Sequence, residues 1–139
     1  LHSVDQIYHR RIAAMEFTLD HDDGLGLDTL HEADIVLCGV SRTSKTPTSI
    51  LLAQQGFRAA NVSLAVDIAP PQQLLALPGT KVVGLTISPD VLVDIRTRRS
   101  IQWQLGDTRY NDRDEVRREL IWCRQLFQKQ GWKSLDVTH

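Results

Sequence analysis

The sequence predicts an α/β protein of the P-loop type, with a mostly parallel sheet and helices on both faces. Short apolar segments of strand length alternate along the chain with longer segments of helical periodicity, an order that favours parallel strands joined by covering helices. One strand–helix junction, residues 39–46, is close to the pattern of a phosphate-binding loop. The 139 residues suit a single domain with its own core, and 42% hydrophobic with 24% charged residues is typical of a globular protein.

The chain is expected to begin with a long helix and a polar turn. Residues 4–20 carry apolar side chains at helical spacing, which predicts an amphipathic helix with Ser3 as its cap. The apolar positions of this helix are Val4, Ile7, Tyr8, Ile12, Met15 and Leu19. Residues 21–31 are polar and contain two glycines, so they are expected to form a turn.

A strand, a loop, a helix and a second strand are expected next. Residues 35–38 form an apolar run of strand length, and residues 46–55 follow the loop with a helical pattern. Gly56 stands where a helix commonly ends in a left-handed residue. Residues 59–64 predict the second strand.

The second half continues the alternation. The expected elements are a short helix (70–77), a strand (81–86), a helix (88–105), a loop (106–111), a helix (112–130) and a strand (135–138). Ser88 is a capping residue followed by a first-turn proline, Asp112 with Glu115 resembles a capping pair, and Gly131 marks a helix end. Apolar residues at helical spacing give the last helix a buried face.

The loop after the first strand is the strongest functional signal. The general pattern is Gly, four residues, Gly, Lys and Ser or Thr; Gly39, Lys45 and Thr46 fit it, and Ser44 replaces the second glycine. Backbone N–H groups and the helix dipole would attract an anion, Lys45 would add a positive charge, and the Thr46 hydroxyl could hold Mg²⁺. The predicted nucleotide-binding residues are Gly39, Val40, Ser41, Arg42, Thr43, Ser44, Lys45 and Thr46. The alternative is an ordinary turn capped by Ser44 or Thr46.

Other polar residues have a functional and a plain interpretation. Asp22 and Asp23 could hold a metal ion or act as a base, or they could be a solvated helix end that Gly24 terminates. The basic residues Arg96, Arg98 and Arg99 read as a solvated helix face, with contact to a phosphorylated partner as the alternative. The residues His21 and His31 read as surface side chains.

Composition excludes several classes. A net charge of −1 gives no general attraction to nucleic acid or anionic membranes, and the apolar runs are too short to span a bilayer. Cys38 and Cys123 read as buried thiols in a reducing cytosol, and no spacing suggests zinc or a Ser-His-Asp hydrolase.

Residues 33–49 closely resemble the nucleotide-binding segment of a known family, the bifunctional kinase–pyrophosphorylase regulatory proteins of pyruvate phosphate dikinase and phosphoenolpyruvate synthase. The likeness extends through His-Asp-Asp-Gly at 21–24, residues 84–89 and 95–99, and the end of the chain at 131–138. In this family Ser at position 44 is an accepted form of the loop. The run Ser-Arg-Thr-x-Lys-Thr-Pro is far more specific than a bare phosphate loop.

The resemblance implies an unusual pair of reactions. ADP would donate its β-phosphate to a threonine of pyruvate phosphate dikinase or phosphoenolpyruvate synthase, leaving AMP, and inorganic phosphate would reverse the modification and leave as pyrophosphate. Lys45, Asp22 and Asp23 would be catalytic, with Mg²⁺ at Thr46. The resemblance also implies one kinase/pyrophosphorylase domain over 1–139 (leading helix 1–30, core 31–139) that lacks the family's N-terminal domain, a cytoplasmic or plant-stromal location, and a homodimer as one arrangement.

Two other functions fit the same loop. One is an ATP-dependent kinase of a small metabolite, which would prefer ATP and need no protein acceptor. The other is a nucleotide-sensing module that binds without turnover. Only an acidic residue near the transferred phosphate would argue against the sensor.

Overall fold

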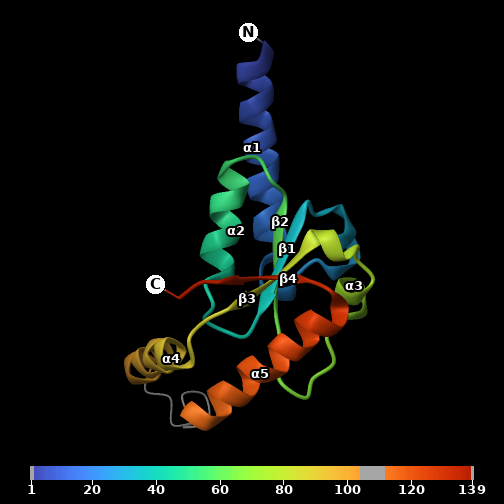
Figure 1. Cartoon of the computed structure of the whole chain (residues 1–139). Coiled ribbons are helices and arrows are strands. Elements are labelled where there is room, and N and C mark those ends of the chain that lie inside the picture. Colours follow the sequence, from blue (N-terminus) through green and yellow to red (C-terminus); the bar gives the residue numbers. More distant parts are fainter. Residues whose placement is uncertain (1, 104–111, 139) are drawn as a thin grey trace.

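The computed structural model describes residues 2–103 and 112–138, which form an α/β fold around a four-stranded sheet (Figure 1). The strands are β1 (Ile35–Gly39), β2 (Ala59–Ser63), β3 (Val82–Thr86) and β4 (Lys133–Asp136). Their order is β2-β1-β3-β4, and every neighbouring pair is parallel. The predicted fold class, a parallel α/β sheet with helices around it, is confirmed.

The sheet places the end of β1 at its centre. Strand β1 lies between β2 and β3, with Val36 opposite both Ala60 and Val82. These three side chains are buried, as expected for a strand covered on both faces. The loop that follows Gly39 therefore leaves from the middle of the carboxyl edge, where ligands of open α/β sheets commonly bind.

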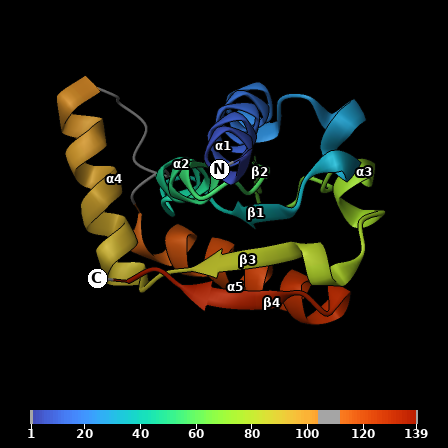
Figure 2. The ribbon, with the colours of Figure 1, turned by 90° about the horizontal axis from the view of Figure 1, so that it is seen from above.

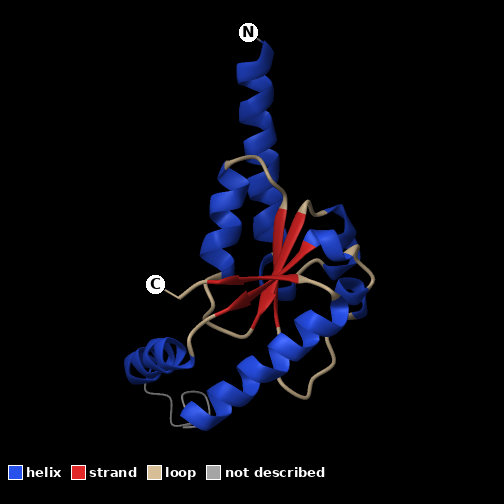
Figure 3. Cartoon of the chain, in the orientation of Figure 1, coloured by secondary structure: helices blue, strands red, loops and turns tan. Residues whose placement is uncertain are grey.

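Helices cover both faces of the sheet. Figure 2 shows α1 and α2 on one side and α5 on the other, with α4 beyond the strand ends. The helices, blue in Figure 3, are α1 (His2–Asp20), α2 (Lys45–Gln54), α3 (Gln72–Leu75), α4 (Pro89–Trp103) and α5 (Arg113–Gln130). The described part of the chain also contains three short 3₁₀ segments: η1 (Asp22–Gly24), η2 (Leu27–Glu32) and η3 (Gly79–Lys81).

The last helix, α5, follows the sequence prediction closely. Its buried residues recur at helical spacing and pack under the sheet: Val116, Leu120, Cys123 and Phe127. The Asp112 carboxylate caps the helix by accepting hydrogen bonds from the N–H groups of Asp114 (2.9 Å) and Glu115 (3.1 Å). Gly131, with φ 72°, ends it.

The first helix, α1, departs from the prediction. It begins at His2, so Ser3 lies inside it rather than capping it. Its predicted apolar stripe is exposed except for the half-buried Met15, with Val4 69% and Leu19 62% accessible, whereas Ala14 and Thr18 are buried. Only the last turns of the helix reach the sheet, because the four strands are short and the first half projects beyond them (Figure 1).

Smaller differences concern the ends of elements. The polar turn over 21–31 contains the two 3₁₀ segments η1 and η2, the helix expected over 70–77 is only Gln72–Leu75, and β4 begins two residues before the predicted position 135. The loop expected over 106–111 lies outside the described residues. Within the part of the chain that the structure describes, no helix is long and apolar enough to cross a membrane.

The two cysteines are buried, as expected from the sequence. Burial raises the pKa of the Cys38 thiol far above its ordinary value, and burial together with the charge of Glu119 raises the pKa of Cys123 to about 12. Both thiols therefore act as small apolar core residues.

Candidate functional site

The loop between β1 and α2 has an uncommon backbone. Arg42 (φ 70°) and Ser44 (φ 62°) both adopt the left-handed conformation, which costs a non-glycine residue roughly 1–2 kcal/mol. Ser44 stands where the general loop pattern has glycine, and its positive φ explains that preference. Such conformations persist where the surrounding structure imposes them and are concentrated at functional sites.

Side chains inside the loop hold its shape. The hydroxyl of Thr43 and the ammonium of Lys45 both donate to the carbonyl oxygen of Val40, each at 2.8 Å. A Cβ at position 39 would lie 3.0 Å from Oγ1 of Thr43 and 3.1 Å from the carbonyl oxygen of Leu85. Glycine at position 39 therefore allows the loop to close tightly over β3.

Lys45 is a buried cation in this loop. The residue is 6% exposed, and its hydrogen bond goes to a neutral carbonyl group. Burial lowers the pKa of Lys45 to about 8, while the negative charge of Asp23 opposes part of that effect. A buried ammonium that is still mostly protonated at neutral pH favours an anion beside it.

The start of α2 lacks the caps that an ordinary turn would supply. Ser44 occupies the capping position without a side-chain capping bond. The hydroxyl of Thr46 donates instead to Oδ1 of Asp22 at 2.7 Å. The first amide groups of a helix have no partner within the helix, so this N-terminus suits an anion. The alternative of a turn capped by Ser44 or Thr46 does not match the structure.

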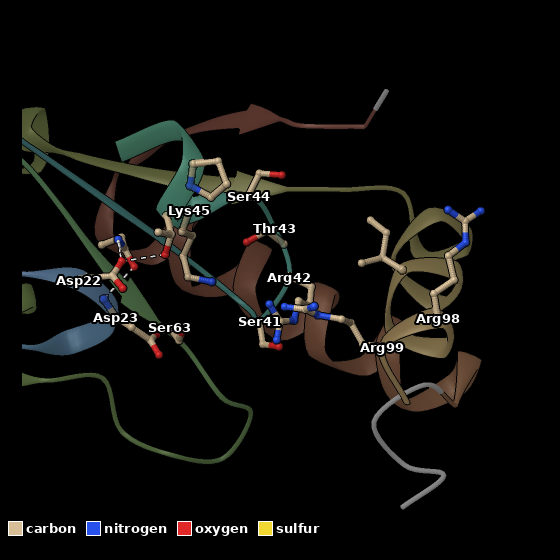
Figure 4. Close-up of a pocket in the computed structure, with 14 residues that line it drawn as sticks. Asp22, Asp23, Ser41, Arg42, Thr43, Ser44, Lys45, Ser63, Arg98 and Arg99 are labelled. Atoms are coloured by element: carbon tan, nitrogen blue, oxygen red, sulfur yellow. Dashed lines mark hydrogen bonds between the residues drawn. The ribbon is translucent and has the colours of Figure 1, made fainter. Parts of the chain in front are cut away.

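The acidic pair lies against the loop and not at a solvated helix end. Helix α1 ends at Asp20, and Asp22 and Asp23 follow in η1. Oδ1 of Asp22 accepts from Thr46 and also from Nδ2 of Asn61 at 2.8 Å (Figure 4). Oδ1 of Asp23 accepts from the Ser63 hydroxyl at 2.5 Å. The plain interpretation of these acids, in which Gly24 terminates the helix, is wrong.

Sequence reasoning missed Asn61 and Ser63. Both lie on β2, two positions apart and hence on one face of the strand. Ser63 is paired in register with Gly39, so the end of β2 lies beside the start of the loop. Oδ1 of the buried Asn61 also accepts from the N–H of Asp23 at 3.0 Å. Two polar residues at the carboxyl end of an otherwise apolar strand are the signal that could have identified them.

Two residues expected on the surface are buried. The first is His21, whose Nδ1 lies 2.7 Å from the carbonyl oxygen of Phe17 and whose Nε2 lies 2.6 Å from Oγ1 of Thr29. Its ring also stacks on Phe17. His31 is exposed, as expected.

The second is Arg96, which is 1% exposed. Its guanidinium forms an ion pair with Glu119 of α5 at 2.5 Å and donates to the carbonyl oxygen of Ser41 at 3.2 Å. The solvated-face interpretation is therefore wrong for Arg96. Its neighbours Arg98, which is exposed, and Arg99, which is half-buried, line a cleft together with the loop residues Ser41 to Thr46.

The loop, the acidic pair and α4 enclose one cleft of about 540 Å³, within the usual range for small-molecule sites. Its lining residues are Asp22, Asp23, Ser41, Arg42, Thr43, Ser44, Lys45, Thr46, Pro47, Asn61, Ser63, Ile95, Arg98 and Arg99. Of the predicted site residues, Gly39 and Val40 are not in this lining but shape the loop beneath it.

The oxygen atoms near Thr46 suit a hard cation. The Thr46 hydroxyl and the Asp22 carboxylate are hydrogen-bonded to each other, and Mg²⁺ prefers such oxygen ligands. Among residues 2–103 and 112–138, no group of three or more His, Cys, Asp or Glu side chains could hold a metal ion. A Mg²⁺ ion here would therefore depend on phosphate and water oxygens as well, which is its usual mode with nucleotides.

Fold and site together define a parallel α/β protein with a candidate anion-binding cleft at the centre of its carboxyl edge. The kinase/pyrophosphorylase family model matches residues 1–139, and the chain belongs to this family.

Curated relatives agree with this assignment, and their names identify them provisionally as pyruvate, phosphate dikinase regulatory proteins. A relative from Novosphingobium aromaticivorans is 45% identical over 138 residues, which cover 99% of this chain and 49% of the relative. Relatives from Maricaulis maris and Trichlorobacter lovleyi are each 47% identical, covering 98% and 99% of this chain and 49% and 52% of the relatives. The chain spans about half the length of these relatives.

Proposed function

We propose that the protein is an ADP-dependent serine/threonine kinase and a phosphate-dependent pyrophosphorylase. Its substrate would be a threonine of pyruvate phosphate dikinase or phosphoenolpyruvate synthase, and the two reactions would inactivate and reactivate that enzyme. Family membership and the relatives' names support the general class. The observation that carries the proposal is the hydrogen bond from Thr46 to Asp22, since it holds the Asp22 carboxylate beside the candidate anion-binding loop.

The residues of the cleft supply the parts that phosphoryl transfer requires. The amide groups of the loop, Lys45 and Arg42 would stabilise the charge on the transferred phosphoryl group. Asp22 or Asp23 would orient the threonine hydroxyl and accept its proton. Thr46 and Asp22 would hold Mg²⁺, which neutralises phosphate charge when bound.

Both reactions can use one cleft because both move the same phosphoryl group. In the kinase direction the threonine oxygen forms a bond to the β-phosphorus, the bond from that phosphorus to the bridging oxygen breaks, and AMP leaves. In the other direction an oxygen of inorganic phosphate attacks the phosphothreonine, the threonine oxygen leaves and is protonated, and pyrophosphate forms. Lys45 is expected to serve both directions, since both transition states spread negative charge over the same oxygens.

The first experiment is calorimetric binding of ADP, AMP, ATP and inorganic phosphate with and without Mg²⁺, followed by transfer assays on the two target enzymes. Binding of ADP in preference to ATP, with threonine phosphorylation of one target, is the expected result. A preference for ATP would favour the small-metabolite kinase. Binding without any transfer to either target would favour the nucleotide-sensing module.

The variant Lys45→Ala tests the single-cleft idea. We expect loss of both kinase and pyrophosphorylase activity, because the same cation faces the transferred group in both directions. Loss of only one of the two activities would show that the reactions use different sites. Arg124→Ala, an exposed position on α5 outside the cleft lining, is the control for a general effect of charge removal.

A further inference from the structure

The cleft has two chemically different ends. Asp22, Asp23 and Ser63 form the acidic end, and Arg98 and Arg99 of α4 form the basic end. Figure 4 shows the loop residues Ser41 to Lys45 between them, with Arg99 extending from α4 toward Arg42. Among residues 2–103 and 112–138, the carboxylates that line the cleft, Asp22 and Asp23, lie at the acidic end.

The basic end is one face of a fixed helix. Ile95, Arg98 and Arg99 are at positions i, i+3 and i+4, which share a side of a helix, and all three line the cleft. The buried Arg96 donates to the carbonyl oxygen of Ser41 in the loop and pairs with Glu119 of α5. These contacts hold the basic face at a set position relative to the loop.

We propose that the basic end, together with Arg42, binds the phosphate group that departs in the kinase direction and attacks in the reverse direction. This inference rests on the proposed function. The ligand is a phosphate in either of two forms, the α-phosphate of the nucleotide or inorganic phosphate. Guanidinium groups suit this role because they donate two parallel hydrogen bonds to phosphate oxygens.

The order of groups along the cleft supports this assignment. In phosphoryl transfer the attacking and leaving oxygens lie roughly in line on opposite sides of the phosphorus atom. The threonine hydroxyl belongs at the acidic end, where a carboxylate can take its proton, and the loop holds the transferred group. The leaving phosphate of AMP then lies on the opposite side, which is the basic end.

Atoms and electrons balance in both directions. In the kinase direction the AMP phosphate departs with the electron pair of the bridging P–O bond, and the threonine proton passes to a carboxylate of the acidic end. In reverse, an oxygen of inorganic phosphate forms the new P–O–P bond from the basic end. The threonine oxygen departs with its bonding pair and takes the proton back. AMP and inorganic phosphate should therefore exclude each other.

The test is calorimetric titration of AMP and of inorganic phosphate, separately and in competition, into the wild-type protein, Arg99→Gln and Arg98→Gln. We expect competition in the wild type and a parallel loss of affinity for both ligands of about tenfold or more in Arg99→Gln, the usual size for a charged hydrogen bond. Arg99→Lys should recover part of the lost affinity, because lysine restores the positive charge but not the two parallel hydrogen bonds of a guanidinium group. Arg124→Gln is the matched control and should bind both ligands as the wild type does.

Three results would overturn the subsite: simultaneous binding of AMP and phosphate, absence of binding of either ligand to the wild type, or unchanged affinities in both Arg98→Gln and Arg99→Gln. The readout separates this inference from the proposed function, since binding needs no turnover. Competitive binding that Arg99→Gln weakens, without transfer to either target enzyme, would retain the subsite and reject the function. Transfer in both directions, with a KM for phosphate that is unchanged in Arg98→Gln and Arg99→Gln, would support the proposed function and reject the subsite.

Discussion

At the scale of single residues, the charge on Lys45 links ligand affinity to pH. Burial lowers its pKa to about 8, so the ammonium loses its proton within an accessible range. A bound anion favours the protonated form, and binding must therefore weaken as pH rises above about 8. We expect the ADP dissociation constant to increase by up to about tenfold per pH unit from that point, the limit for loss of one required proton.

The measurement is ADP calorimetry between pH 7.5 and 9.5, where the phosphates of the ligand no longer change their ionisation appreciably. Lys45→Met should bind weakly with little pH dependence over this range, because it has no proton to lose. An equally steep profile in Lys45→Met would assign the effect to another group.

Asp22 and Asp23 make different contacts, so substitution of each by asparagine should affect the protein differently. Asp22 accepts from Thr46 after the loop, whereas Asp23 accepts from Ser63 at the end of β2. Asp23→Asn should slow transfer by about a hundredfold or more, the usual range for a lost general base, with ADP affinity almost unchanged. A comparable loss of ADP affinity in Asp23→Asn would indicate that this residue serves metal coordination or folding instead.

At the scale of elements, the close spacing between β3 and α5 depends on glycine at position 84, which has no side chain. A Cβ on Gly84 would lie 2.5 Å from the ring of Phe127, which is buried against the sheet. Gly84→Ala should therefore lower the free energy of unfolding by about 1–3 kcal/mol, as overpacked cores do, measured by denaturant titration. Leucine at position 127 is smaller than phenylalanine and should relieve the contact. The double variant Gly84→Ala/Phe127→Leu should therefore lose less stability than the sum of the losses in the two single variants. Strict additivity would place the strain elsewhere.

The elements also show what local sequence can and cannot predict. The loop residues were identified because they are contiguous, and α5 because its apolar residues follow one helical period. Asn61 was missed because its role depends on the register between β1 and β2 and on a hydrogen bond to Asp22. The sequence pattern of a strand predicts neither of these. The exposed stripe of α1 was misjudged for a similar reason, since amphipathic spacing predicts a helix but not which of its turns reach the sheet.

At the scale of the whole molecule, the cleft is assembled from segments distant in sequence and depends on contacts outside it. Arg96 illustrates this dependence, since its burial follows from α5 supplying Glu119 and the loop supplying the carbonyl group of Ser41. No local pattern distinguishes it from Arg98 and Arg99, which the same helix presents to the cleft. The fold class could be predicted from the alternation of strands and helices alone. The contacts of Arg96 form only when α4, α5 and the loop are all in place.

Variants that change stability and ligand affinity separately would test whether Arg96 connects α4, α5 and the loop. Glu119→Ala removes one partner of a largely buried ion pair and leaves the charge of Arg96 behind, which should lower the free energy of unfolding by about 3 kcal/mol. Arg96→Met/Glu119→Leu replaces both charges with apolar groups and should recover most of that loss. The double variant, unlike Glu119→Ala, lacks the hydrogen bond from Arg96 to Ser41, so its affinity for inorganic phosphate should be several-fold below that of the wild type. Denaturant titration and calorimetry on the same samples give both quantities. Recovery of stability together with full phosphate affinity would show that α4 and the loop keep their relative position without Arg96.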